Sequence, residues 1–390
     1  MTFRVQVYNK IAPAGLKKLA TLGELAEADD PHAIVLRSHN LHDYAINPSL
    51  LAIGRAGAGV NNIPVDQCTD NSVVVFNTPG ANANAVKELV MLGMLLGSRD
   101  VIGGIQFVQS LPVDTALAKT VEANKSRFSG DELQGKSLGV IGLGAIGSMV
   151  ANTAVQLGMT VYGFDPHIAI NWAWRLSPQV NRSEVLRDLL GKVDYVSLHV
   201  PATTATRSFF NQALVDQLKP GAVLLNFSRA DIVKEEALIA GLESGQLRQY
   251  ITDFPSETLV THPGVISIPH LGASTVQAEE NCAIMIADQI HDFLRYGTIT
   301  NSVNYPTCKL PRSAPYRLAI TNDNVPNIIG RVTTLLAALK INISDMINKS
   351  NGEVAYTLID THDDITPDMI DRIRAISGVK RCRLLPISTE

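Results

Sequence analysis

A glycine-rich turn between an apolar strand and an apolar helix limits the folds open to this chain. In Ser137-Leu-Gly-Val-Ile-Gly142-Leu-Gly144-Ala-Ile-Gly147 three glycines have the spacing Gly-x-Gly-x-x-Gly. The first suits a tight turn, the second lets backbone N–H groups approach a pyrophosphate, and the third lets helix and strand pack closely. Asp165, eighteen residues after Gly147, ends the next strand. A carboxylate there accepts hydrogen bonds from ribose hydroxyls and repels a 2′-phosphate, so the pattern predicts a dinucleotide site that prefers NAD to NADP.

Plainer interpretations of this segment stay open. The glycines can serve packing alone, and Asp165 can form a turn before Pro166, which is a common role of Asp. The stretch from Ser137 to Phe164 carries no charge and is long enough to span a bilayer. Its polar side chains and six glycines favour a buried strand–helix–strand unit instead, so no membrane partner is expected.

Bulk composition excludes several other classes of protein. A chain of 390 residues is too long for one core and predicts two or three domains. The net charge is -4 and there is no Lys/Arg tract, so no nucleic-acid partner is expected. Four cysteines without a Cys-x-x-Cys pair indicate neither a disulfide framework nor a metal site. The first residues resemble a strand rather than a signal peptide, and a cytoplasmic location is expected.

Alternation of short apolar strands with helices predicts an α/β fold with two doubly wound parallel sheets. One is expected to be a flavodoxin-like substrate-binding domain (residues 1–96 and 274–303), and the other a Rossmann NAD domain (97–273). Three prolines within residues 304–315 suggest a linker, placed at 304–314. Residues 315–390 have the order βαββαβ, which is the ferredoxin-like arrangement.

Three side chains that could do chemistry lie in the second alternating unit. Arg229 and His270 follow expected strands, and Glu257 lies in Thr252-Asp-Phe-Pro-Ser-Glu-Thr258. Ligands of open α/β sheets bind beyond the carboxyl ends of the strands, so these positions suit a catalytic site. Each has a plain alternative: a solvated loop arginine, a surface carboxylate and a histidine satisfied by backbone. Their joint occurrence behind a dinucleotide motif favours the catalytic interpretation.

At these residues the chain resembles the D-specific 2-hydroxyacid dehydrogenases. The family's Asn-x-x-Arg, Asp-x-Phe-x-x-Glu and Pro-His-x-Gly motifs match Asn226-Phe-Ser-Arg229, Asp253-Phe-Pro-Ser-Glu257 and Pro269-His-Leu-Gly272. The middle match is one residue shorter than the family spacing, and Ala230 replaces a common Gly. The resemblance implies that His270 is the general acid/base, that Glu257 holds its other ring nitrogen, and that Arg229 binds the substrate carboxylate. It also implies these cofactor-binding residues: Gly142, Gly144, Ala145, Ile146, Gly147, Asp165, His199, Pro201, Thr206, Asp253 and Gly272.

The first sheet is expected to supply the substrate pocket. Arg37 and Arg55 stand at the tips of neighbouring expected strands, close enough to hold one phosphate group between them. This resembles the branch of the family that oxidises 3-phosphoglycerate, with no metal required. The substrate-binding residues implied are Arg37, Ser38, Arg55, Ala58, Gly59 and Asn82.

Residues 315–390 look like an ACT domain, a regulatory module that often binds an amino acid between paired copies. The resemblance implies L-serine as an effector at Asn322, Asn324 and Asn342, within a homo-oligomer, either a dimer or a tetramer. Asn322 stands where serine-inhibited relatives often have histidine, so a plain dimerisation role stays open. Two alternatives for the whole protein also stay open: another D-2-hydroxyacid dehydrogenase of the glyoxylate/glycerate type, or a non-catalytic, corepressor-like NAD sensor.

Overall fold

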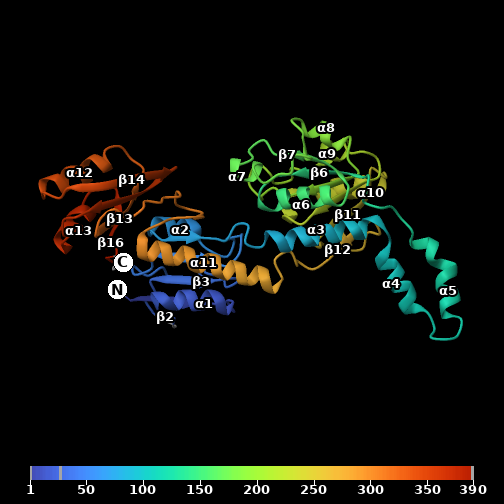
Figure 1. The fold of residues 1–390 in the computed structure, drawn as a ribbon, viewed down its shortest axis with the longest axis horizontal. Coiled ribbons are helices and arrows are strands. Elements are labelled where there is room, and N and C mark those ends of the chain that lie inside the picture. Colours follow the sequence, from blue (N-terminus) through green and yellow to red (C-terminus); the bar gives the residue numbers. More distant parts are fainter. Residues whose placement is uncertain (1, 26–28, 388–390) are drawn as a thin grey trace. The chain divides into compact units, whose positions relative to one another are not determined.

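The computed structural model describes residues 2–25 and 29–387, which fold into two compact units (Figure 1). The first unit comprises Met1–Ala81 and Glu279–Glu390, and the second comprises Asn82–Ala278. The outermost ends of the predicted domains, residues 1 and 388–390, lie outside the described residues. Each unit contains a parallel sheet, so the predicted α/β fold class is confirmed. The division into three domains with a linker stays a prediction.

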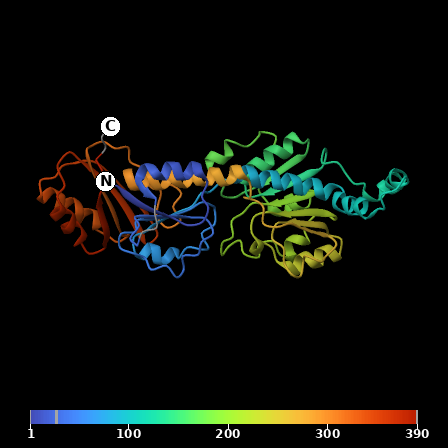
Figure 2. The same ribbon diagram turned by 90° about the horizontal axis from the view of Figure 1, so that it is seen from below.

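The parallel sheet of the first unit has the strand order β2-β1-β3-β4-β5, a flavodoxin-like order. Its strands are β1 (Phe3–Val7), β2 (Gly23–Leu25), β3 (Ala33–Leu36), β4 (Ala52–Arg55) and β5 (Val74–Phe76). Side chains alternate between two cores: Ala33 and Val35 belong to one, Ile34 and Leu36 to the other. Helices α1 (Pro13–Leu19) and α11 (Val276–Tyr296) cover the first of these faces, and α2 (Val65–Asp70) covers the second (Figure 2). Burial on both faces explains the near-continuous apolar strands.

The sheet of the second unit has the order β12-β11-β10-β9-β6-β7-β8. Its strands are β6 (Ser137–Ile141), β7 (Thr160–Phe164), β8 (Asn181–Arg182), β9 (Tyr195–Leu198), β10 (Ala222–Asn226), β11 (Leu247–Thr252) and β12 (Val265–Ser267). The strand order reverses between β6 and β9, which creates the switch point where dinucleotides bind in such sheets. The strands β2, β8 and β11 are absent from the sequence prediction.

Helices cover both faces of this second sheet. Residues of α3 (Ala83–Ser98) and α6 (Ala145–Gln156) share one core with Val140 and Leu225. Residues of α8 (Leu186–Leu190), α9 (Gln212–Val215) and α10 (Glu235–Glu243) share the other core with Ile141 and Leu224. The short α7 (Ile170–Ala173) follows β7. After α3 come α4 (Val101–Ser110) and α5 (Leu117–Asn124), neither of which contains a buried residue.

The C-terminal module, residues 316–384, has an antiparallel sheet in the order β14-β15-β13-β16. Its elements are β13 (Tyr316–Asp323), α12 (Ile328–Ala338), β14 (Ile343–Asn351), β15 (Val354–Thr361), α13 (Pro367–Arg374) and β16 (Val379–Leu384). The predicted βαββαβ arrangement is therefore confirmed. One face of this sheet carries α12 and α13, and the other shares a core with α11 through Tyr356, Leu358 and Phe293.

The uncharged segment from Ser137 to Phe164 forms β6, α6 and β7, all within the second unit. In the part of the chain that the structure describes, no helix combines the length and the apolar character needed to cross a membrane.

Candidate functional site

Of the three glycines in the turn between β6 and α6, Gly144 alone faces open space. Gly142 has φ +90°, and a Cβ there would lie 2.6 Å from the carbonyl oxygen of His199. A Cβ on Gly147 would lie 1.9 Å from the carbonyl oxygen of Gly142. By contrast, no described atom beyond the chain neighbours of Gly144 lies within 4 Å of a Cβ placed on that residue. The outer two glycines are therefore required by the chain itself, and Gly144 leaves open space that a phosphate can approach.

Asp165 links the end of β7 to this turn. Its Oδ2 accepts a hydrogen bond from the Leu143 backbone N–H at 2.8 Å, and its Oδ1 accepts one from the His167 N–H at 2.9 Å. The second bond is the turn-forming role that the sequence left open. A carboxylate offers about four lone-pair positions, so acceptors remain for ribose hydroxyls.

His199 lies behind the turn. Its Nε2 is 2.8 Å from the Ser197 Oγ, and its Nδ1 is buried with no hydrogen-bond partner among the described residues. Burial lowers the pKa of His199 to about 3, so the ring is neutral. A Cβ on Gly147 would approach the His199 Cβ at 3.3 Å. His199 thus packs against the turn at Gly142 and Gly147.

The loop after β9 contains two more of the predicted cofactor-binding residues. The Thr206 hydroxyl donates a hydrogen bond to the carbonyl oxygen of Pro201. These two residues therefore shape the loop next to the predicted dinucleotide site.

Arg229 is positioned by a buried asparagine at the end of β10. The Asn226 Nδ2 donates to the Arg229 carbonyl oxygen at 2.9 Å, and the Thr252 hydroxyl donates to the Asn226 carbonyl oxygen at 2.8 Å. The Arg229 guanidinium is exposed and donates to the Ser228 carbonyl oxygen at 2.6 Å. Asn226 is a positioning residue that the site prediction omitted, although it begins the Asn-x-x-Arg motif.

Asp253, the first residue after β11, is only 1% exposed. The Gly272 N–H donates to its Oδ2 at 3.2 Å, and its Oδ1 is buried with no partner among the described residues. Burial raises the pKa of the Asp253 carboxyl, and the nearby charges of His270 and Arg229 oppose that rise. Arg229, Asp253 and His270 follow the adjacent parallel strands β10, β11 and β12, so all three lie at the edge of the sheet where the carboxyl ends of these strands meet.

His270 follows β12 and has an exposed side chain. Its ring centroid is 4.8 Å from that of Phe254, and the two rings are inclined by 55°. Glu257 is also exposed, and no hydrogen bond or ion pair joins it to His270 among the described residues. The contact between Glu257 and His270 therefore stays a prediction.

The two predicted phosphate-binding arginines lie at the ends of neighbouring strands of the first unit, Arg55 as the last residue of β4 and Arg37 directly after β3. Leu36 pairs with Arg55 across β3 and β4, and the Arg55 Nε donates to the Arg37 carbonyl oxygen at 2.9 Å. Arg55 also donates to the Gly59 carbonyl oxygen. The Arg37 Nη1 forms an ion pair with the Glu279 Oε1 at 2.7 Å. The arginines are adjacent as the sequence suggests, but Arg37 already has an anionic partner.

Other predicted substrate-binding residues are divided between the units. The Ser38 N–H donates to the Asn9 Oδ1 at 3.0 Å, and the Ala58 carbonyl oxygen accepts from the Asn77 Nδ2 at 2.6 Å. Asn82 begins the second unit as the N-terminal cap residue of α3, without a side-chain capping bond. A shared role of these residues in substrate binding stays a prediction.

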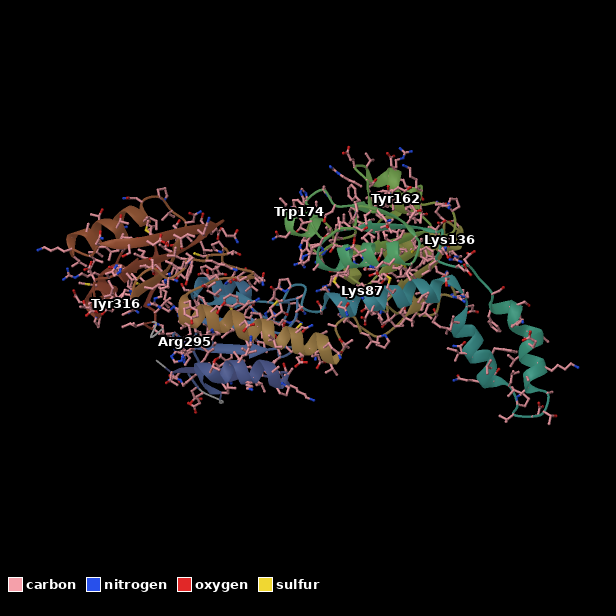
Figure 3. All side chains as sticks on the ribbon, in the orientation of Figure 1. Lys87, Lys136, Tyr162, Trp174, Arg295 and Tyr316 are labelled. Carbon is pink, nitrogen blue, oxygen red and sulfur yellow. The ribbon has the colours of Figure 1, made fainter. Side chains whose placement is uncertain are left out.

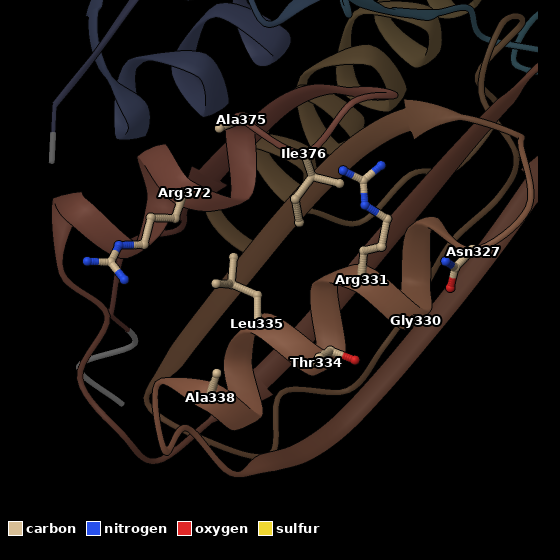
Figure 4. A pocket seen from close by; sticks show the side chains of 9 residues that line it. All are labelled: Asn327, Gly330, Arg331, Thr334, Leu335, Ala338, Arg372, Ala375 and Ile376. Carbon is tan, nitrogen blue, oxygen red and sulfur yellow. The ribbon is translucent and has the colours of Figure 1, made fainter.

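The three predicted effector residues lie at strand ends of the C-terminal module. The Asn322 Oδ1 is buried with no partner among the described residues, and the Asn324 Nδ2 donates to the Gly352 carbonyl oxygen at 2.8 Å. The Asn342 N–H donates to the Asp363 Oδ2 at 2.7 Å. An open groove between α12 and α13, with Arg331 at its edge, contains none of these asparagines (Figure 4). The effector site therefore stays a prediction.

Comparison with known proteins identifies the family. A family model for the NAD binding domain of the D-isomer specific 2-hydroxyacid dehydrogenases matches residues 106–272. The D-3-phosphoglycerate dehydrogenase of Haemophilus influenzae is 32% identical in an alignment that covers 95% of this chain and 90% of that protein. The chain belongs to the D-isomer-specific 2-hydroxyacid dehydrogenase family. The Escherichia coli K12 protein of the same name is 31% identical, over 91% of this chain and 87% of its own length.

Two solved structures share the fold of this chain. The NAD+-bound 3-phosphoglycerate dehydrogenase of Entamoeba histolytica aligns with a TM-score of 0.60 and 25% identity, over 78% of this chain and 99% of that one. The D-mandelate dehydrogenase of Rhodotorula graminis shares the fold, with a TM-score of 0.67 at 22% identity over 80% of this chain and 100% of that one. The chain is an NAD-dependent oxidoreductase, and the predicted cofactor NAD is confirmed. In the described part of the chain, no three His, Cys, Asp or Glu side chains are placed to hold a metal ion.

Proposed function

We propose that this dehydrogenase oxidises 3-phospho-D-glycerate to 3-phosphohydroxypyruvate with NAD, the first step of phosphorylated serine biosynthesis. One observation carries the proposal: nearly the whole chain aligns with D-3-phosphoglycerate dehydrogenases of Haemophilus influenzae and Escherichia coli. The order of its strand-end residues Arg229, Asp253 and His270 fits the same chemistry.

In this proposal two side chains act on the substrate and a third orients one of them. Arg229 binds the carboxylate, since a guanidinium donates two parallel hydrogen bonds to such a group. His270 accepts the proton of the C2 hydroxyl, leaving the electron pair of the O–H bond to form the C=O bond. Bound NAD supplies the acceptor for the hydride that leaves C2. Glu257 is proposed to hold the second ring nitrogen of His270 and to stabilise the charged ring.

Arg37 and Arg55 are proposed to bind the phosphate. A guanidinium has five N–H donors, so the ion pair of Arg37 with Glu279 leaves donors for a ligand. Glu279 would at the same time repel a phosphate dianion and weaken its binding. This ion pair is the feature that favours the second candidate, oxidation of an unphosphorylated acid such as glycerate.

The decisive measurement is NADH production from 3-phospho-D-glycerate, compared with D-glycerate. Loss of a charged hydrogen bond costs about 1.5–3 kcal/mol, so Arg55→Ala should raise the KM for the phosphorylated acid by roughly 10- to 100-fold. The KM for D-glycerate should stay within about threefold of the wild-type value, since only the phosphorylated acid uses that bond. Equal effects on the two acids would refute the phosphate assignment.

We also propose that L-serine binds the C-terminal module of a homo-oligomer, either a dimer or a tetramer. Support comes from the ferredoxin-like arrangement of the module and from its resemblance to an ACT domain. The assay above, repeated with L-serine, tests the effector. An unchanged rate at saturating serine would leave the module with a structural role.

A further inference from the structure

One lysine lies on the buried side of α3. Ala83, Val86, Val90 and Met94 are buried there, and they follow the spacing of a helix face that packs against the sheet. Lys87 falls within this stripe, because it precedes Val90 by three residues and Met94 by seven. Its side chain is only 17% exposed. A lysine in this position is a departure from the pattern, since the buried face of a helix normally carries apolar residues.

The first turns of α3 lie at the catalytic edge of the second sheet. A Cβ on Gly272 would be 3.4 Å from the Val86 side chain, and Gly272 is two residues beyond His270. At the other end of α3, Gly97 faces Val223 near the start of β10. The helix therefore runs antiparallel to the strands. Lys87, next to Val86, belongs to the edge that also carries His270.

The positive charge of Lys87 is only weakly balanced by an anion of the protein. Its Nζ is 3.7 Å from the Glu88 Oε1, which is longer than a hydrogen bond. Glu88 is 62% exposed and already accepts a hydrogen bond from the Asn84 Nδ2 at 2.8 Å. No other ion pair of Lys87 occurs among the described residues. An ammonium group that has lost much of its water needs an anion close by, and an exposed pair at this distance stabilises it little.

We propose that Lys87 binds an anionic oxygen of the substrate, on either its carboxylate or its phosphate. The inference rests on the proposed function, in which the substrate carries both groups. Arg229 and Lys87 then provide two cations at one edge of the sheet, from the loop after β10 and from α3 respectively. Lys87 is a binding residue in this view, because its charge contacts the substrate and moves no proton.

The same geometry allows a competing ligand. Helix α3 packs against α6, whose N-terminus adjoins the glycine turn of the cofactor site. A cation on α3 could therefore serve the pyrophosphate of the dinucleotide instead. The experiment has to separate substrate binding from cofactor binding.

Lys87→Gln removes the charge, Lys87→Met keeps most of the apolar stem without the charge, and Lys87→Arg keeps the charge. Lys136→Gln is the matched control, because Lys136 is also half-buried, at 35% exposure, and pairs with Asp131 at 3.3 Å. Lys136 directly precedes β6, at the opposite edge of the sheet (Figure 3). The readouts are KM and kcat for 3-phospho-D-glycerate and D-glycerate, the Kd of NADH from fluorescence, and the melting temperature.

Lys87→Gln and Lys87→Met should both raise the KM for the substrate by roughly 10- to 100-fold, as expected for a lost charged hydrogen bond. The kcat and the Kd of NADH should stay within about threefold of the wild-type values, and Lys87→Arg should recover most of the loss. A KM effect confined to 3-phospho-D-glycerate assigns Lys87 to the phosphate. An effect on both acids assigns it to the carboxylate.

Three results would overturn the inference: an unchanged KM in both charge-removing variants, an effect of equal size in Lys136→Gln, or a rise confined to the Kd of NADH. Failure of the proposed function looks different. Wild-type enzyme would then oxidise D-glycerate but not 3-phospho-D-glycerate, and the role of Lys87 would be judged from the KM for D-glycerate in the same set of variants.

Discussion

At the scale of single residues, burial separates the two carboxylates of the Asp253–Glu257 segment. Asp253 is buried beside Gly272, and its raised pKa reflects that burial, with His270 and Arg229 as the opposing charges. Glu257, on the exposed side of the same loop, makes no bond to His270 among the described residues. Of the two carboxylates, only Asp253 bonds to the Pro269–Gly272 segment among the described residues, through the Gly272 N–H.

Replacement of His270 tests its chemical role. His270→Ala should lower kcat by roughly 10²- to 10⁴-fold, the usual contribution of a general acid or base. The Kd of NADH should be nearly unchanged, because the residues proposed to bind the dinucleotide, the glycine turn and Asp165, are intact in this variant. Steady-state kinetics and fluorescence titration measure the two quantities.

Glu257→Gln provides the comparison for His270→Ala. A drop in kcat would support the predicted contact with the ring. A wild-type kcat in His270→Ala itself would contradict the proton-transfer role of His270.

At the scale of elements, the β6–α6 turn shows how one motif meets two different requirements. Gly142 and Gly147 are required by close approaches within the protein, to His199 and to each other. Gly144 faces open space. Two glycines are thus required by packing within the protein and one leaves open space, in agreement with the division of roles expected from their spacing.

Two alanine substitutions separate these requirements. Gly144→Ala should leave the melting temperature near its wild-type value and raise the Kd of NADH, because the added methyl group enters the ligand space. Gly147→Ala should lower the melting temperature as well, because its Cβ would lie 1.9 Å from a backbone oxygen. Thermal unfolding and NADH titration check both variants. Wild-type affinity for NADH in Gly144→Ala would contradict the placement of the phosphate at this glycine.

At the scale of the whole molecule, segments from both ends of the chain build the first unit. Helix α11 contributes Ile286 and Phe293 to a core shared with β1 and with the C-terminal module. The expected linker is bonded to this unit, since the Asn304 side chain accepts from the Val75 N–H at 2.8 Å. The module is joined further by Arg381, which donates to the Leu50 carbonyl oxygen at 2.7 Å. These contacts give the module a fixed attachment to the first parallel sheet.

A fully buried ion pair secures this attachment. The Arg317 Nε donates to the Asp360 Oδ1 at 2.6 Å and its Nη2 to the Oδ2 at 2.7 Å, with both side chains 0% exposed. Arg317 also donates to the carbonyl oxygens of Leu310, at 2.8 Å, and of Tyr296, at 3.1 Å. Arg317→Met should lower the free energy of unfolding by about 3–5 kcal/mol, because it leaves Asp360 buried and unpaired.

Urea denaturation measures that change, and the double variant Arg317→Met/Asp360→Leu should recover most of the loss. Burial alone would raise the pKa of Asp360, but hydrogen bonds from Arg317 and Ser313 lower it overall. The pair's stabilisation is therefore complete above the unfolded-state pKa of about 3.9 and is lost as the pH falls through the lower folded value. Wild-type stability of the single variant at neutral pH would contradict the role of the pair.

Local patterns in the sequence were enough to predict the α/β class, the glycine turn, the position of Asp165 after a strand and the βαββαβ module. Each of these features depends on the spacing of residues that are close together in the chain. They missed β11, where Arg248 and Gln249 interrupt the apolar run; both residues lie near the start of the strand and are not buried, whereas Tyr250, Ile251 and Thr252 are. The sequence did not single out Lys87 either, because a lysine in a helix is ordinary unless it lies on the buried face of that helix. Tertiary structure alone decided which residues became neighbours: Asp253 beside Gly272, Arg37 paired with Glu279, and Lys87 on the buried stripe of α3. Such contacts join residues far apart in the chain, and they arise only when the packing of helices on sheets brings those residues together.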